Sequence, residues 1–167
     1  MCWLMKHVSV KILYVFSIIL VISILSSCSI ENYSTRKIVA NNEILSYLNN
    51  DGCDVLPDSL GLVYIPLKHG NGVCPKYNDV VAFHYTGYYL NGEVFDTSYG
   101  KSRPLIVQLG DNQLIKGLEY ALLKMDKGAK AKVIIPFYLA YGNMENGPVP
   151  PYSNLVFELE LIGIDTK

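Results

Sequence analysis

The stretch that decides the fold is residues 80–96, VVAFHYTGYYLNGEVFD. Its first part is rich in β-branched and aromatic residues, which favour strands. Three of its apolar residues alternate and would share one face: Val81, Phe83 and Tyr85. Asn91-Gly92 follows, and both residue types tolerate the positive φ of a tight hairpin turn. We therefore expect a strand over Val80–Leu90 and an antiparallel partner over Glu93–Asp96.

Segments on both sides of this hairpin have the pattern of further strands and one helix. The expected strands are Gly61–Leu67, Leu105–Leu109, Ala129–Ile135 and Asn154–Ile164. In the last two, apolar residues alternate with Lys or Glu, so one face of each strand should be buried. Apolar residues at helical spacing predict a helix over Asn112–Lys124, with Gly110-Asp111 as its N-cap. This pattern predicts an α+β fold in which a curled antiparallel β-sheet wraps around one short helix.

A short N-terminal helical extension precedes this domain. Apolar residues over Arg36–Asn49 are spaced as on an amphipathic helix, which Asn49-Asn50-Asp51-Gly52 would end. Its apolar face could serve dimerisation. Packing against its own domain is the interpretation that we prefer.

The first 27 residues have the parts of a secretory signal peptide. They include Lys6, His7 and Lys11 and no acidic residue. The apolar run Ile12–Leu25 has 14 residues, fewer than the roughly 20 that a transmembrane helix needs. We expect residues 1–27 to be an address that is removed rather than part of the fold.

The end of this segment, Leu25-Ser26-Ser27-Cys28, resembles the lipobox of bacterial lipoproteins. In such proteins the Cys carries the lipid and becomes the first residue of the mature chain. The resemblance implies lipidation of Cys28 (palmitate among the chains), and residues 28–59 would be a lipidated tether with the short helix. A plain signal peptide or an uncleaved anchor is the alternative. We expect a membrane-anchored lipoprotein outside the cytoplasm. The polar Ser29 favours the outer membrane or cell surface.

Charge and composition exclude several classes of function. With 14 Lys+Arg against 15 Asp+Glu, the chain lacks the basic surplus of a nucleic-acid-binding domain. Four dispersed Cys and three His do not form a metal-binding pattern, and there is no phosphate-binding loop or nucleophile elbow. We expect neither metal nor cofactor. Cys53 and Cys74 could form a disulfide or remain separate thiols.

Six segments carry a resemblance to one family. They are FHYTG (83–87), GEVFDTS (92–98), LIKGLE (114–119), AYG (140–142), VPP (149–151) and NLVFELEL (154–161). In this order and spacing they resemble the FKBP-type peptidyl-prolyl cis-trans isomerases, from about residue 60 to residue 164. The resemblance implies an FKBP-like isomerase domain over residues 60–167. It also implies a peptidyl-prolyl cis-trans isomerase that accelerates Xaa-Pro exchange during folding of extracytoplasmic proteins.

The resemblance also implies a site. The catalytic residues would be Asp96, Tyr141 and Phe95. The substrate-binding residues would be Tyr85, Leu105, Leu114, Ile115, Leu118, Val149 and Phe157. Aromatic walls would receive the proline ring, while the Ile115 N–H and the Tyr141 hydroxyl would bind substrate carbonyls. Considered one at a time, the aromatic residues could equally be ordinary core residues.

The chain departs from the family pattern at the pocket. Leu118 stands where many members have Trp, and Leu105 where an aromatic residue is common. Lys101 and Gln113 replace a frequent Arg and a frequent Glu. We expect proline-containing polypeptides as partners and macrolide inhibitors to bind with reduced affinity. The alternative function is a non-catalytic or weakly catalytic chaperone or binding module on the same fold.

Overall fold

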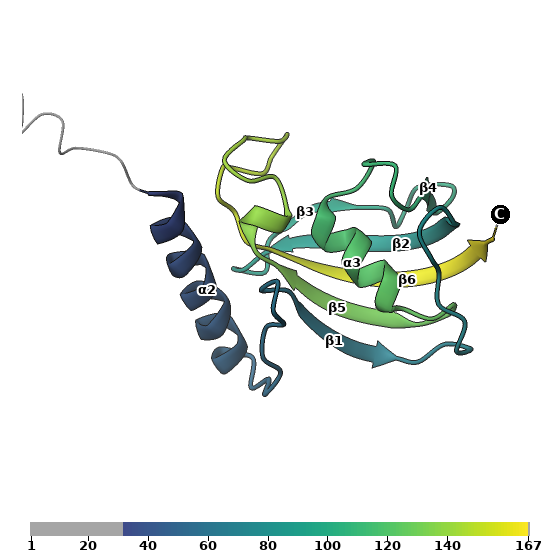
Figure 1. The fold of residues 1–167 in the computed structure, drawn as a ribbon, viewed down its shortest axis with the longest axis horizontal. Coiled ribbons are helices and arrows are strands. Elements are labelled where there is room, and N and C mark those ends of the chain that lie inside the picture. Colours follow the sequence, from purple (N-terminus) through teal and green to yellow (C-terminus); the bar gives the residue numbers. More distant parts are fainter. Residues whose placement is uncertain (1–31, 167) are drawn as a thin grey trace, which may run out of the picture. The chain divides into compact units, whose positions relative to one another are not determined.

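A computed structural model of the chain describes residues 32–166 (Figure 1). The signal segment and Cys28 lie outside the described residues. From Arg36 onwards the chain forms one compact unit. The elements are α2 (Tyr33–Asn50), β1 (Val63–Lys68), β2 (Val80–Tyr89), β3 (Val94–Thr97), β4 (Leu105–Gln108), α3 (Lys116–Lys124), β5 (Lys130–Ile135), the 3₁₀ turn η1 (Phe137–Leu139) and β6 (Leu155–Asp165).

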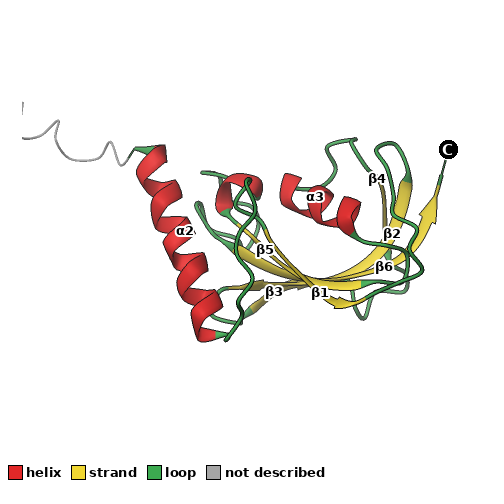
Figure 2. Ribbon diagram, turned by 60° about the horizontal axis from the view of Figure 1, so that its bottom comes forward, coloured by secondary structure: helices red, strands yellow, loops and turns green. Residues whose placement is uncertain are grey.

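The six strands form one antiparallel sheet in the order β1-β5-β6-β2-β3, and β4 also pairs with β2. The long ladder between β2 and β6 runs from Val80 opposite Asp165 to Tyr89 opposite Leu155. β4 pairs with the first half of β2 and β3 with its second half. Figure 2 shows the curved sheet with α3 on one side of it. The predicted fold class is therefore confirmed.

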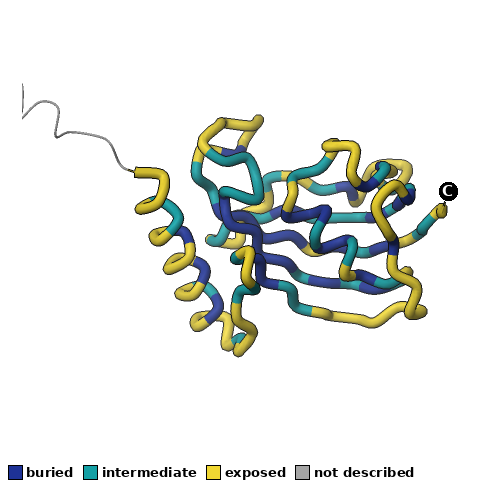
Figure 3. The backbone as a smooth tube through the Cα atoms, in the orientation of Figure 1, coloured by how far each residue is buried: buried dark blue, intermediate teal, exposed yellow. Residues whose placement is uncertain are grey.

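The main core lies between α3 and the sheet. Figure 3, coloured by the burial of each residue, shows many buried residues along the inner strands. It contains Leu122 from α3 and alternate residues such as Val133 of β5 and Phe157 of β6, all almost fully buried. Gly117 allows α3 to approach β5 closely, because a Cβ there would lie 2.3 Å from Ile135 Cγ2. The outward Glu158 and Glu160 of β6 follow the predicted alternation.

Helix α2 packs on a second apolar cluster. Its buried residues Ile44 and Leu48 contact a group made of Val63, Ile134 and Val156. These strand residues alternate with those that face α3, so they belong to the opposite face of the sheet. The predicted packing of this helix against its own domain is confirmed for the part from Arg36 onwards.

The buried Asn154 side chain ties α2 to the sheet. Its amide nitrogen donates to the Ala40 carbonyl at 3.1 Å and to Glu43 Oε2 at 2.8 Å, and its oxygen accepts from Phe137 N–H at 3.0 Å. The predicted apolar stripe of the helix is only partly used, because Ile38, Val39 and Leu45 are exposed.

One further expectation needs correction. Helix α3 begins at Lys116, four residues later than predicted, with Ile115 as an extended N-cap. The cause is local: Asn112 adopts φ +55°, which interrupts a helix, and Asp111 accepts from the Gln113 side chain instead of capping. Of the two alternatives left open for Cys53 and Cys74, the structure has the separate thiols, and Cys74 is exposed.

Candidate active site

A cavity of about 380 Å³ opens beside the N-terminus of α3. Every residue predicted for the pocket lines it except Val149. The lining residues are Tyr85, Phe95, Asp96, Leu105, Asn112, Gln113, Leu114, Ile115, Leu118, Tyr141, Asn146 and Phe157. They come from four strands, one helix and two loops, so only the folded sheet brings them together.

Three aromatic rings form the apolar wall of the cavity. Phe95 and Phe157 meet edge to face, with ring centroids 5.6 Å apart and planes at 89°. Tyr85 lies 6.1 Å from Phe157 at 56°. Gly87 makes this arrangement possible, because a Cβ at that position would lie 2.6 Å from Phe95 Cζ and 3.0 Å from Phe157 Cε1. The pairing of Gly87 with Asp96 across β2 and β3 brings the glycine close to these rings.

Asp96 is held at the rim of the cavity. Its Oδ2 accepts a hydrogen bond of 2.5 Å from the Tyr85 hydroxyl, and its Oδ1 accepts from Thr97 N–H at 2.8 Å. Lys101 Nζ lies 3.5 Å from the same Oδ1. Burial, together with the hydrogen bond to the Asp96 carboxylate, raises the pKa of Tyr85 far above its ordinary value. Tyr85 therefore stays protonated and donates to Asp96 at any physiological pH.

The segment that precedes α3 contributes backbone and apolar groups. Ile115 is extended, and its carbonyl accepts from Leu118 N–H at 3.0 Å. Among the hydrogen bonds of residues 32–166, none is donated by the Ile115 amide. The nearly buried Leu118 follows on the first turn of α3. Glu119 fixes the approach to this segment, since its Oε1 accepts from Gly110 N–H at 2.9 Å.

Tyr141 enters the cavity from the loop after η1. Burial and the nearby Asp96 carboxylate raise the pKa of Tyr141, although a hydrogen bond with the Asn146 side chain acts in the opposite direction. Asn146 and Val149 exchange two backbone hydrogen bonds of 3.0 Å, which close the tip of this loop. The hydroxyl of Tyr141 is therefore a protonated donor.

The resemblance also implies that Val149 binds substrate. Val149 is buried in the main core and does not line the cavity. Its bonds with Asn146 turn its side chain to the core and place Asn146 at the cavity instead. The prediction missed Asn112 and Asn146, and no local pattern marks either residue, since the course of two loops decides their position. Gln113 was noticed only as a departure from the family pattern.

The chemistry available in this cavity is limited to apolar contact and hydrogen bonding. Within residues 32–166, no group of three or more His, Cys, Asp or Glu side chains could bind a metal ion. The ionisable groups of the lining are Asp96, Tyr85 and Tyr141. The Tyr85 hydroxyl donates to the Asp96 carboxylate, but its raised pKa makes it a poor nucleophile, so the cavity suits a change of conformation better than bond cleavage.

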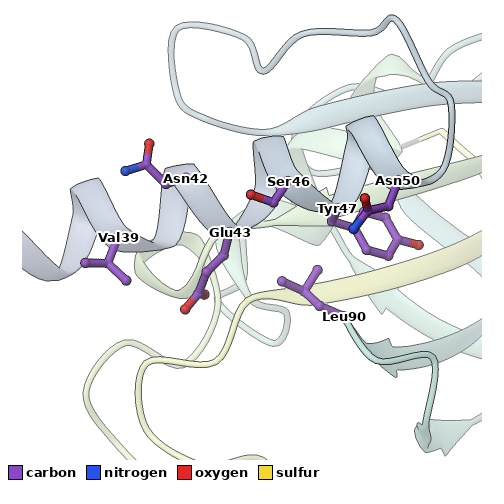
Figure 4. A pocket seen from close by; sticks show the side chains of 7 residues that line it. All are labelled: Val39, Asn42, Glu43, Ser46, Tyr47, Asn50 and Leu90. Atoms are coloured by element: carbon purple, nitrogen blue, oxygen red, sulfur yellow. The ribbon is translucent and has the colours of Figure 1, made fainter.

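A second concavity, of about 490 Å³, runs along α2 (Figure 4). It is lined by Val39, Asn42, Glu43, Ser46, Tyr47, Asn50 and Leu90. Its carboxylate, Glu43, already accepts from Asn154. The cavity beside α3 is the better candidate active site, because apolar walls and a few convergent polar groups are typical of ligand pockets.

Comparisons with known proteins identify a matching family model and several relatives. A family model described as FKBP-type peptidyl-prolyl cis-trans isomerase matches residues 72–162. FK506-binding protein 2 of Debaryomyces hansenii is 43% identical over 89 residues, which are 53% of this chain and 66% of that protein. The isomerase FkpA of Escherichia coli is 39% identical over 110 residues, 66% of this chain and 40% of FkpA. The chain thus spans less than two thirds of the length of these two relatives.

Solved structures agree. The crystal structure of FkpA superimposes with a TM-score of 0.67 at 30% identity, covering 93% of this chain and 70% of FkpA. A peptidyl-prolyl cis-trans isomerase from Pseudomonas syringae pv. tomato superimposes with a TM-score of 0.65 at 29% identity, covering 83% of this chain and 99% of that one.

Proposed function

Since the chain belongs to the FKBP-type peptidyl-prolyl cis-trans isomerase family, we propose that it catalyses cis–trans exchange of Xaa-Pro bonds in polypeptides. One observation carries the proposal. A cavity of about 380 Å³ has three aromatic walls, with hydrogen-bond donors and a fixed carboxylate at its rim.

Rotation about a peptide bond meets a barrier of about 18–20 kcal/mol, because amide resonance must be broken. A thousandfold acceleration therefore needs only about 4 kcal/mol of differential stabilisation of the twisted state. No covalent bond breaks and no proton has to move. Such a reaction needs no activated nucleophile, and the two tyrosines of the cavity have raised pKa values.

The residues of the cavity provide this stabilisation in two ways. The walls of Tyr85, Phe95 and Phe157 exclude water around the imide. The twisted imide has lost conjugation and is less polar than the planar one, so an apolar wall favours it. The Ile115 amide and the Tyr141 hydroxyl are donors that can bind the carbonyls on either side, with the strongest bonds in the twisted state. Tyr85 and Thr97 hold Asp96 at the rim, beside the place of the substrate proline ring, whose imide nitrogen becomes pyramidal in the twisted state.

The test is an exchange assay on a blocked Xaa-Pro peptide with the full chain purified in mild detergent. We expect catalysis in the parent, and a loss of roughly tenfold or more in kcat/KM for Asp96→Asn and for Tyr141→Phe. Asp54→Asn is the matched control, since Asp54 is exposed and lines neither cavity. A well-folded parent without exchange would support the non-catalytic binding module instead.

We also propose that the protein is a lipoprotein outside the cytoplasm, where its substrates would be proteins that fold there. The support comes from the N-terminal segment that closes with Leu25-Ser26-Ser27-Cys28. These residues lie outside the part of the chain that the structure describes. Among residues 32–166, no helix has the length and apolar character to span a membrane. Metabolic labelling with a palmitate analogue should mark the parent and not Cys28→Ala. Labelling that persists in the variant would contradict lipidation at Cys28.

A further inference from the structure

A smaller hollow, of about 250 Å³, adjoins the candidate active site. Its lining residues are Tyr85, Ser98, Lys101, Ser102, Arg103, Pro104 and Leu105. Tyr85 and Leu105 line both this hollow and the active-site cavity. A polypeptide whose proline occupies the aromatic cavity can therefore place a neighbouring residue in the hollow, because successive residues are at most about 3.3–3.6 Å apart along an extended chain.

The loop that forms the hollow is held at both ends. Several hydrogen bonds hold buried Ser98 to β2: its N–H donates to the Tyr85 carbonyl at 2.9 Å, and its Oγ accepts from Tyr85 N–H at 2.8 Å and lies 3.0 Å from His84 Nδ1. A turn follows, closed by a 3.2 Å bond from Lys101 N–H to the Ser98 carbonyl, with Gly100 at φ +87°. Leu105 then enters β4 opposite Phe83. The hollow is thus built from fixed backbone.

The charge of the hollow has one sign. Lys101 and Arg103 line it, and no acidic residue does. Lys101 lies at the border between the hollow and the active-site cavity, because its Nζ is 3.5 Å from Asp96 Oδ1 and 5.8 Å from the centre of the Tyr85 ring. Arg103 is exposed and forms no ion pair with any acidic group of residues 32–166. Its guanidinium presents a planar set of donors that matches a carboxylate.

We propose that this hollow is a basic subsite for the side-chain carboxylate of an Asp or Glu that flanks the substrate proline. The inference rests on the proposed isomerase function and adds a substrate preference to it. Arg103 provides the main contact, and Lys101 adds charge at the border with Asp96. Substrates with an acidic neighbour to proline are thereby favoured over neutral and basic ones.

The test compares peptides that carry Glu, Gln or Lys at each of the two positions before and the two positions after a single proline, with both ends blocked. Exchange is measured with the full chain in mild detergent. We expect one position at which kcat/KM for Glu exceeds that for Gln by up to roughly fivefold, the upper end of the range for an exposed ion pair. Lys should be the poorest residue there, and high salt should reduce the advantage of Glu.

Arg103→Gln should bring the ratio of the Glu to the Gln peptide close to one. Lys127→Gln removes one positive charge from an exposed turn residue that lines neither the hollow nor the active-site cavity, so this variant should keep the parental ratio of the Glu to the Gln peptide. Equal rates for Glu and Gln at every position would overturn the proposal, as would a ratio that survives in Arg103→Gln. An advantage confined to peptides with a free carboxyl end would assign the subsite to a chain terminus and overturn the side-chain assignment.

The Gln peptides separate this proposal from the one on which it rests. If they are exchanged and Glu gives no advantage, only the subsite fails. If no peptide is exchanged, the isomerase proposal fails. The NMR shift of the Arg103 side chain on addition of Glu or Gln peptide then still decides whether the hollow binds a carboxylate.

Discussion

Replacement of Gly87 by Ala should damage the aromatic wall while it leaves the fold intact. The new Cβ would lie 2.6 Å from Phe95 Cζ and 2.9 Å from Phe95 Cε2. Favourable carbon contacts are about 3.5–4.0 Å long, so the ring end has to retreat by roughly 1 Å. Phe157 Cε1, at 3.0 Å, restricts movement in its direction. The Phe95 ring therefore has to leave the position at which it meets Phe157.

The expected loss of stability is modest, because two effects oppose each other. Overpacking costs about 1–3 kcal/mol. Gly87 does not have a positive φ, so alanine is not strained there. The lower entropy of the unfolded chain then stabilises the folded variant by about 0.4–1 kcal/mol. We expect the free energy of unfolding to fall by roughly 0.5–2 kcal/mol. The kcat/KM should fall at least tenfold, since a shift of about 1 Å in a catalytic constellation can cost up to roughly a hundredfold.

The assay pairs urea unfolding with exchange of a blocked Xaa-Pro peptide. Gly163→Ala is the matched control, because this β6 glycine also lacks a positive φ and its new Cβ would meet only Ala82 Cβ, at 3.7 Å. That variant should unfold like the parent or slightly later and keep its activity. In a Phe95→Leu background, Gly87→Ala should cost less stability than in the parent. Unchanged activity and unchanged stability in Gly87→Ala would refute the close approach of Gly87 to the two rings.

Three further outcomes are expected. Leu118→Trp should tighten macrolide binding in calorimetric titration while Xaa-Pro exchange survives, because Leu118 lines the cavity and an aromatic contact adds roughly 0.5–1.5 kcal/mol beyond area burial. Equal or weaker binding by the folded variant would contradict this role of position 118. Peptide mapping after alkylation of the unreduced, unfolded protein should find both Cys53 and Cys74 alkylated, and their recovery as one linked peptide would contradict the free thiols. The hydrogen bond from Lys130 to Glu160, at 3.0 Å, lowers the pKa of Glu160 despite partial burial, so the stabilisation by this ion pair is present above pH 4.5 and declines as the pH falls through the lowered pKa. Lys130→Met should therefore lower the free energy of unfolding by up to about 1 kcal/mol at pH 7, measured by urea unfolding. An equally large loss in strong acid would exclude this ion pair as its cause.

The regular elements could be read from the chain because their causes are local. Asn91-Gly92 marks the hairpin turn by residue type alone; in the structure Gly92 adopts φ +87°, whereas Asn91 has no positive φ. Alternation in β6 sets Phe157 and Leu159 inward and Glu158 outward. The resemblance that rests on these segments also identified nine residues that line the cavity.

The remaining features depend on the conformation of loops or on contacts between segments far apart in the sequence. Asn112 interrupts the helix that apolar spacing predicts from residue 112, and the bonds between Asn146 and Val149 send Val149 into the core. The buried side of α2 is set by its packing on Val63, Ile134 and Val156 and by the hydrogen bonds of Asn154, which lies more than a hundred residues away in the chain. The sequence by itself determined the strands, the central turn and the family resemblance, because periodicity and turn chemistry act within a few residues. Only the tertiary structure decided which side chains meet at the cavity and that a basic hollow adjoins it, because these depend on how loops and sheet pack together.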